Sequence, residues 1–180
     1  MTKITLFTGP RGAGKSTRLI HEYHSRGNGL CFFSLKKRDD DGNVCAYDLV
    51  LYPKNETLPF FVKDPDVDME TASKETLAVR DLTNGMMHSC SYFVHLSAFD
   101  RAMQYYKEHP EAKEIWIDEI GRIEVAGKGF YELLMTAIAN GKDVFIVVRN
   151  NFVPKLIPLL PTDADINIVE INTNKTETPT

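Results

Sequence analysis

The stretch KITLFTGPRGAGKST, residues 3–17, decides the fold of this chain. Its first six residues are rich in β-formers and the next six contain three glycines. Lys15 to Arg26 then places apolar side chains at near-helical spacing. A strand, a glycine loop and a helix therefore follow one another, and Gly9 to Ser16 match the pattern G-x-x-x-x-G-K-[ST].

This pattern in this setting predicts a phosphate-binding loop. The glycines let the backbone turn without Cβ clashes, so that successive N–H groups converge on phosphate oxygens at a helix N-terminus. We expect Lys15 to be catalytic by reaching the β- and γ-phosphates, and Ser16 to bind Mg²⁺ through its hydroxyl. The residues expected to contact the nucleotide are Gly9, Pro10, Arg11, Gly12, Ala13, Gly14, Lys15, Ser16 and Thr17. The alternative is a glycine-rich turn with an incidental lysine, and Arg11 in particular either contacts phosphate or points to solvent.

A second constellation, IWIDE at residues 115–119, is an apolar strand that ends in two carboxylates. It is typical of a Walker B segment. Beside a phosphate loop, Asp118 is expected to act on Mg²⁺ by accepting from its bound water or from Ser16. Glu119 is expected to orient a water for attack on the γ-phosphate. The alternative is that the two carboxylates only end a strand in solvent.

Arg122 follows at once, in the segment Gly121-Arg122-Ile123-Glu124. We expect it to lie near the triphosphate and to be catalytic by neutralising charge on the transferring group. A salt bridge to Glu124 or to another acid is the equal alternative.

Strand-like and helix-like segments alternate along the rest of the chain. Strands are predicted at 30–35, 43–52, 58–62, 92–96, 114–118, 143–149 and 165–171, and helices at 97–109, 128–140 and 152–160. Asp-Gly at 41–42 indicates a hairpin after the first helix. The alternation predicts a three-layer α/β fold, with a mostly parallel central sheet covered by helices on both faces.

The length of 180 residues predicts one domain over 1–171. Within it, 64–91 is rich in Asp, Thr, Ser and Met without a sustained period, and we expect an irregular insertion there. The polar end, 172–180, is expected to be a flexible tail.

Composition excludes several classes of protein. With 43% hydrophobic and 26% charged residues the chain is an ordinary globular sequence. Its 25 acids against 21 bases argue against a nucleic-acid or anionic-membrane partner. The three cysteines lack the spacing of a disulfide framework or zinc ribbon, and no apolar run approaches the ~18 residues of a membrane span. We therefore expect a soluble, cytoplasmic protein whose partner is a nucleoside triphosphate, while a protein partner cannot be named.

Further segments resemble the small P-loop nucleoside-triphosphatases, also described as nucleotide phosphatase/kinase proteins. A family segment of the type G-F-Y-T-x-E-x-R is similar to CFFSLKKR at 31–38, and its G-F-D is similar to AYD at 46–48. The signature I-D-E-I-G-[KR]-M-E is similar to IDEIGRIE at 117–124. An aromatic strand leading into a helix, at 92–99, and Phe130 also fit.

The resemblance implies a RecA-like fold and slow, Mg²⁺-dependent hydrolysis of triphosphates such as ATP or GTP with loose base selectivity. It implies the same phosphate, metal and water-positioning roles for Lys15, Ser16, Asp118 and Glu119. Two other functions stay open: a nucleotide or small-molecule kinase, in which one carboxylate accepts a proton from an acceptor hydroxyl, and a nucleotide-dependent switch or binding protein.

Overall fold

The first two elements of the fold lie where the sequence predicts them. A computed structural model of the chain describes residues 1–172, and β1 (Lys3–Gly9) leads through a loop into α1 (Lys15–Arg26). Apolar side chains are buried on both faces of β1, with Ile4 and Leu6 on one face and Phe7 on the other. β1 is therefore an inner strand covered on both sides.

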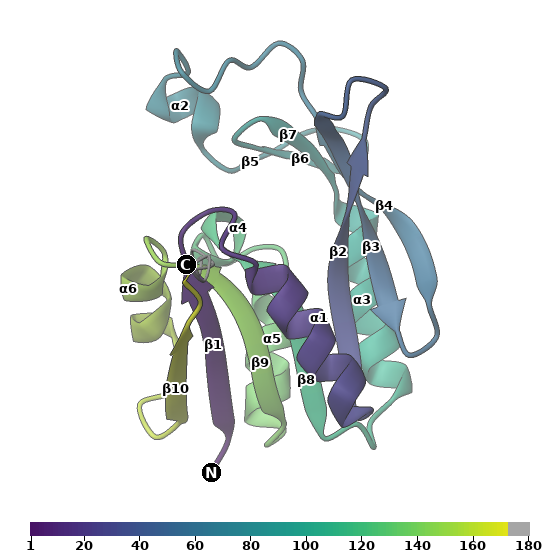
Figure 1. Ribbon diagram of the computed structural model, residues 1–180, viewed down its shortest axis with the longest axis vertical. Helices are drawn as coiled ribbons and strands as arrows, with labels where there is room; N and C mark the ends of the chain where they lie inside the picture. Colours follow the sequence, from purple (N-terminus) through teal and green to yellow (C-terminus); the bar gives the residue numbers. More distant parts are fainter. Residues whose placement is uncertain (173–180) are drawn as a thin grey trace, which may run out of the picture.

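The parallel part of the sheet is built around β1. Its other strands are β2 (Leu30–Arg38), β8 (Glu114–Ile120), β9 (Asp143–Arg149) and β10 (Asp165–Glu170). They lie in the order β10-β1-β9-β8-β2, and each neighbouring pair is parallel. The carboxyl ends of these strands therefore share one edge, at which the β1–α1 loop also lies (Figure 1).

The antiparallel part extends further than the predicted hairpin. It contains β3 (Val44–Tyr52), β4 (Glu56–Lys63), β5 (Arg80–Asp81), β6 (Met86–Ser89) and β7 (Tyr92–His95). These strands continue from β2 in the order β3-β4-β7-β6-β5, which completes ten strands within the described residues.

The prediction of an irregular segment over 64–91 is wrong in part. This segment contains α2 (Lys74–Leu77), β5 and β6. The strands have only two and four residues, too few to show a sequence period, and they form because β6 pairs with the edge of β7. Buried His88 anchors the segment, since its Nε2 lies 2.9 Å from Asp64 Oδ2.

Helices cover both faces of the sheet, so the predicted three layers are present (Figure 1). α1 covers one face, where Leu19 and Tyr23 pack on Phe7, Trp116 and Phe145. The other face is covered by α3 (Leu96–Glu108) and α5 (Tyr131–Ala139), which enclose the larger core. Shorter elements are α4 (Arg122–Val125), α6 (Val153–Leu156) and a 3₁₀ turn, Ile157–Leu159.

The helix expected from residue 128 begins at Tyr131, because Lys128, Gly129 and Phe130 form a turn ahead of it. Of the expected tail, 173–180 lie outside the described residues. Among residues 1–172 we find no helix with the length and apolar character that a membrane crossing requires.

Candidate nucleotide-binding site

The loop between β1 and α1 starts at a close approach of two backbones. Ile171 N donates to Thr8 O at 2.7 Å, next to Gly9. A Cβ on Gly9 would lie 2.3 Å from Ile171 O, and the φ of Gly9 is 156°. Only glycine fits this position, so the sequence pattern and the tertiary contact require the same residue.

The N-terminus of α1 is left open. Its N-cap is Gly14, so no side chain caps the helix, and the first turn has no acidic residue. By contrast, Ser73 accepts from Thr76 N at the start of the four-residue α2. Among residues 1–172, the first N–H groups of α1 therefore have no side-chain acceptor, and they lie at the positive end of the helix dipole, an arrangement that suits an anion.

Lys15 is folded back over this loop. It is only 8% exposed, and its Nζ donates to Pro10 O at 2.6 Å. Burial lowers the pKa of the Lys15 ammonium, while the charge of Glu119 raises it and that of Arg149 lowers it. The ammonium therefore lies among other charged groups at the carboxyl edge of the sheet.

Asp118 joins the two motifs of the sequence. Ser16 Oγ donates to its Oδ1 at 2.7 Å, and Ser34 N on β2 donates to its Oδ2 at 3.2 Å. The residue is 1% exposed, so Asp118 does not end its strand in solvent. Burial raises the pKa of Asp118 to about 7, against the opposing effect of these two hydrogen bonds.

A β-bulge gives the neighbouring residues Asp118 and Glu119 different environments, one buried and one exposed. β8 has one more residue than β9 between two paired positions, since Ile117 pairs with Ile146 and Ile120 pairs with Val148. Glu119 occupies the bulge with a φ of 62°, and its side chain is 41% exposed. The bulge therefore directs one carboxylate inward and brings the next to the open edge.

Arg149 is the site residue that the sequence interpretation missed. It ends β9, and its Nη2 lies 3.0 Å from Glu119 Oε1. The segment DVFIVVR already showed a buried strand ending in a charge. Nothing in the sequence placed that strand between β1 and β8, which is what brings Arg149 to the loop.

Arg122 forms no ion pair with these groups within residues 1–172. It is exposed on α4, and its guanidinium is 5.8 Å from the ring centre of Phe152. The alternative ion pair with Glu124 is absent from the ion pairs of residues 1–172. Instead, buried Glu124 accepts from Gly121 N at 3.0 Å and from Phe130 N at 3.2 Å.

Glu124 is expected to make the free energy of unfolding depend on pH. Burial raises the pKa of Glu124 from 4.5 to about 7, although its two backbone hydrogen bonds act in the opposite direction. The folded state then holds a proton that the unfolded chain releases, so the free energy of unfolding falls as pH rises through this window. For this carboxyl the expected fall is of the order of 3 kcal/mol.

Denaturant unfolding of the nucleotide-free protein at pH 4.5, 6 and 8 measures this. Glu124→Gln should remove the part of the difference that belongs to Glu124, about 3 kcal/mol, and leave the part due to Asp118, whose pKa is also raised to about 7. Glu111→Gln, at an exposed position, should retain the whole difference. A Glu124→Gln profile as steep as that of the unchanged protein would argue against the raised pKa.

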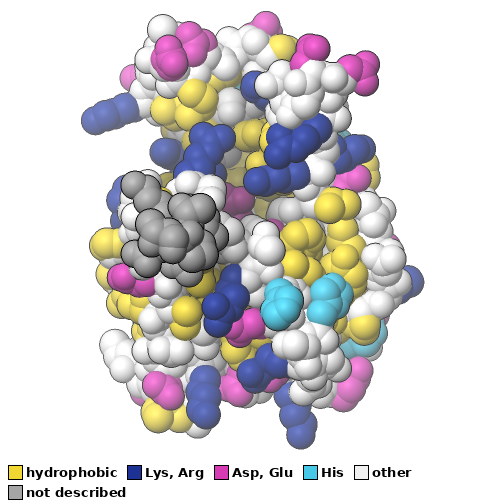
Figure 2. All heavy atoms as spheres, in the orientation of Figure 1, with side chains coloured by type: hydrophobic (Ala, Val, Ile, Leu, Met, Phe, Trp, Pro, Cys, Tyr) yellow, Lys and Arg dark blue, Asp and Glu magenta, His cyan; other side chains and the backbone are white. Residues whose placement is uncertain are grey.

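The antiparallel strands form one wall of the site. Tyr47 lies in an aromatic cluster with Phe61 and Tyr92, at ring-centre distances of 6.1 and 5.7 Å. Burial raises the pKa of Tyr47 to about 12, Tyr92 and the charge of Glu119 add to the rise, and Arg11 opposes it. The charge of Arg11, which is exposed at the loop, therefore acts on this aromatic cluster. Figure 2 shows the surface hollowed below the antiparallel part, with Lys and Arg side chains along the upper edge of the hollow.

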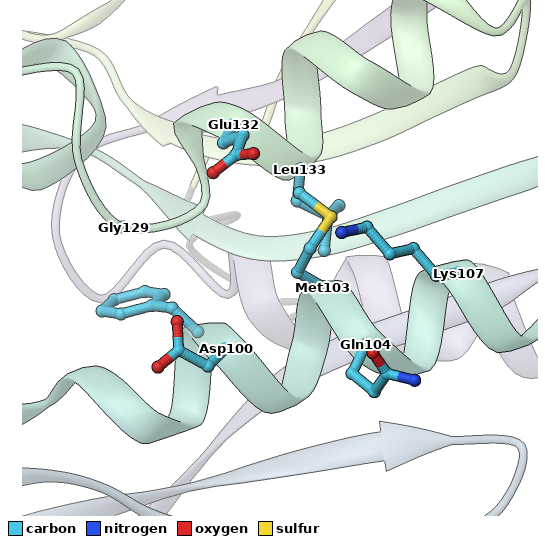
Figure 3. A pocket seen from close by; sticks show the side chains of 8 residues that line it. Asp100, Met103, Gln104, Lys107, Gly129, Glu132 and Leu133 are labelled. Atoms are coloured by element: carbon cyan, nitrogen blue, oxygen red, sulfur yellow. The ribbon is translucent and has the colours of Figure 1, made fainter.

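A separate groove of about 290 Å³ runs between α3 and the start of α5 (Figure 3). Its lining residues are Phe99, Asp100, Met103, Gln104, Lys107, Gly129, Glu132 and Leu133. None of the predicted site residues lines it, so this groove is distinct from the loop site.

An open helix N-terminus behind a glycine loop, with a serine hydrogen-bonded to an aspartate on a later strand, is the arrangement of a P-loop nucleotide-binding protein. The sequence model of the protein family described as NTPase matches residues 65–179, which is more than half of the chain. The chain therefore belongs to this NTPase family, and the family supports nucleoside-triphosphatase activity in general. A comparison with curated proteins gave no match.

Two solved structures share the fold. The solution structure of a human cancer-related nucleoside triphosphatase is 20% identical with a TM-score of 0.59, over 94% of this chain and 89% of that one. The crystal structure of THEP1 from the hyperthermophile Aquifex aeolicus is 19% identical with a TM-score of 0.53, over 96% and 90% of the two chains. At these identities the likeness establishes the α/β fold alone.

Proposed function

We propose that the protein is a Mg²⁺-dependent nucleoside-triphosphatase that hydrolyses the γ-phosphate of ATP or GTP, with loose selectivity for the base. The observation that carries this proposal is the 2.7 Å hydrogen bond from Ser16 Oγ to Asp118 Oδ1. It joins the phosphate loop to an acidic strand 102 residues later, and Glu119 follows directly at the open edge. The free cysteines Cys31, Cys45 and Cys90 fit a reducing cytoplasm, which is the location we propose.

The donor set of the site fits Mg²⁺. A hydroxyl and a carboxylate are hard oxygen ligands, which Mg²⁺ prefers. No group of three or more His, Cys, Asp or Glu within residues 1–172 could hold a metal alone, and Mg²⁺ commonly takes one or two protein ligands beside phosphate and water. We assign its binding to Ser16 and Asp118. The bound ion would neutralise charge on the β- and γ-phosphates.

The residues of the chain divide the remaining work. The N–H groups of residues 9–17 hold the phosphates, and the Lys15 ammonium exchanges Pro10 O for phosphate oxygens. Glu119 orients a water and accepts its proton while the water oxygen bonds to the γ-phosphorus. The bond from this phosphorus to the bridging oxygen breaks, and the diphosphate leaves with the electron pair. Arg122 is proposed as a further positive group beside the transferring phosphate.

Glu119→Gln tests this function. Without the proton acceptor, phosphate release from MgATP and MgGTP should fall about 100-fold. The affinity for a non-hydrolysable triphosphate analogue, measured by calorimetry, should change less than threefold, because the loop and the metal ligands are intact. Glu56→Gln, in a distant glutamate–arginine pair, is the matched control and should retain the rate.

An unchanged rate in Glu119→Gln would contradict the assigned role. The unchanged protein must also release phosphate in water with no acceptor present. Phosphate transfer that occurs only when an acceptor alcohol or nucleotide is added would identify a kinase instead.

A further inference from the structure

Arg149 lies between the phosphate loop after β1 and the acidic residues at the end of β8. β9 is the sheet neighbour of both β1 and β8. In the register of the sheet Arg149 is paired with Gly9, the first glycine of the loop, on one side. On the other side lies the bulge of β8, where its guanidinium reaches Glu119.

The contact between Arg149 and Glu119 is suited to exchange. The two side chains are 45% and 41% exposed, with 3.0 Å between Nη2 and Oε1. Ion pairs this exposed are held weakly, because water solvates both partners. The charge of Arg149 also acts on Lys15, so both cations lie at the place proposed for the end of the triphosphate.

The ion pair with Arg149 occupies a carboxylate oxygen of Glu119 that the proposed reaction needs. An oxygen of Glu119 that accepts from a guanidinium is less available to accept a proton from water. A γ-phosphate offers a guanidinium two or three oxygens and more negative charge than a carboxylate, and arginine binds such groups through two parallel hydrogen bonds. A triphosphate in the loop therefore competes directly for Arg149.

We propose that Arg149 is a catalytic residue that pairs with Glu119 in the nucleotide-free protein and transfers to the γ-phosphate when a triphosphate binds. The transfer releases Glu119 to accept the proton of the attacking water. It also places a positive charge against the oxygens of the departing phosphoryl group, in the manner of an arginine supplied within the same chain. This inference rests on the proposed function. It adds Arg149 to Arg122 and assigns to Arg149 the main role in stabilising the transferring phosphoryl group.

Kinetics of Arg149→Gln test the catalytic part. We expect kcat for phosphate release to fall about 100-fold, with Arg149→Lys intermediate because it keeps the charge but not the fork. Affinity should fall for the non-hydrolysable triphosphate and stay the same for the diphosphate, which lacks the γ-phosphate. Arg101→Gln, on α3, breaks the ion pair with Glu56 of β4 and should keep kcat unchanged. A kcat within threefold of the unchanged protein in Arg149→Gln, or a larger loss in Arg122→Gln, would overturn the proposal.

A measurement without turnover tests the exchange in the unchanged protein. The guanidinium NMR signal of Arg149, assigned by its disappearance in Arg149→Lys, should shift on adding Mg²⁺ and the non-hydrolysable triphosphate. Adding Mg²⁺ and the diphosphate should leave it in place. Equal shifts with both nucleotides, or none, would refute the transfer even if the protein hydrolyses triphosphates. Absence of hydrolysis together with a triphosphate-specific shift would instead refute the proposed function and keep the exchange.

Discussion

Replacing Lys15 by methionine is expected to lower phosphate release about 1,000-fold. The ammonium of Lys15 lies 2.6 Å from Pro10 O in the phosphate loop and is almost enclosed, at 8% exposed. Methionine matches its length and keeps the packing of its stem, but it carries no charge to place against the β- and γ-phosphates. Because burial already lowers the pKa of this ammonium, a bound triphosphate would also stabilise its charged form.

Steady-state phosphate release and calorimetric titration with the non-hydrolysable triphosphate measure the two effects of Lys15→Met. The chain contains a close match for a control, since Lys142 Nζ also donates to a proline carbonyl, that of Pro110, at 2.6 Å. Lys142 precedes β9 at the amino end of the strand, so Lys142→Met should keep both rate and affinity. Equal losses in the two variants would mean that the lysine–carbonyl contact matters for folding and not for the phosphates.

Replacing Glu124 by alanine is expected to produce the largest loss of stability, about 3 kcal/mol or more. The carboxylate is 4% exposed and is the acceptor for Gly121 N and Phe130 N, which flank α4 and precede α5. Alanine leaves two N–H groups without that acceptor in a place where water enters poorly. The turn is packed closely around this carboxylate in the folded protein, since a Cβ on Gly129 would lie 2.6 Å from Glu124 Oε1.

Thermal unfolding measures this loss, and for a chain of this size it corresponds to a melting temperature roughly 6–12 °C lower. Glu124→Gln should lie between, since its amide keeps one acceptor oxygen. Glu111→Ala removes an exposed glutamate and should leave the melting temperature unchanged. A Glu124→Ala protein as stable as Glu111→Ala would show that the two backbone groups find other partners.

These variants also distinguish two roles within the signature IDEIGRIE. The sequence interpretation took Asp118, Glu119 and Arg122 as the chemical residues and considered Glu124 only as a partner for Arg122. In the fold, Glu124 holds the turn that follows the acidic strand, and Arg122 lies against Phe152. The sequence motif therefore contains both residues proposed to take part in the reaction and residues that hold the backbone in place.

The sequence by itself determined the phosphate loop, the bounds of α1, the buried strand from 143 to 149, and the α/β layering. These features follow from local physics: glycine permits the loop, and apolar periods of about two or four residues specify strands and helices. Asp118 could be selected because a carboxylate that ends an apolar strand is conspicuous next to such a loop.

Only the tertiary structure decided the rest. Strand order places β9 between the strand of the loop and the acidic strand, and this order alone brings Arg149 to Glu119. β5 and β6 exist because β7 offers an unpaired edge, and the bulge at Glu119 exists because β8 must fit the register of β9. Such pairings join residues far apart in the chain, so their energies depend on neighbours that no local pattern of residues identifies.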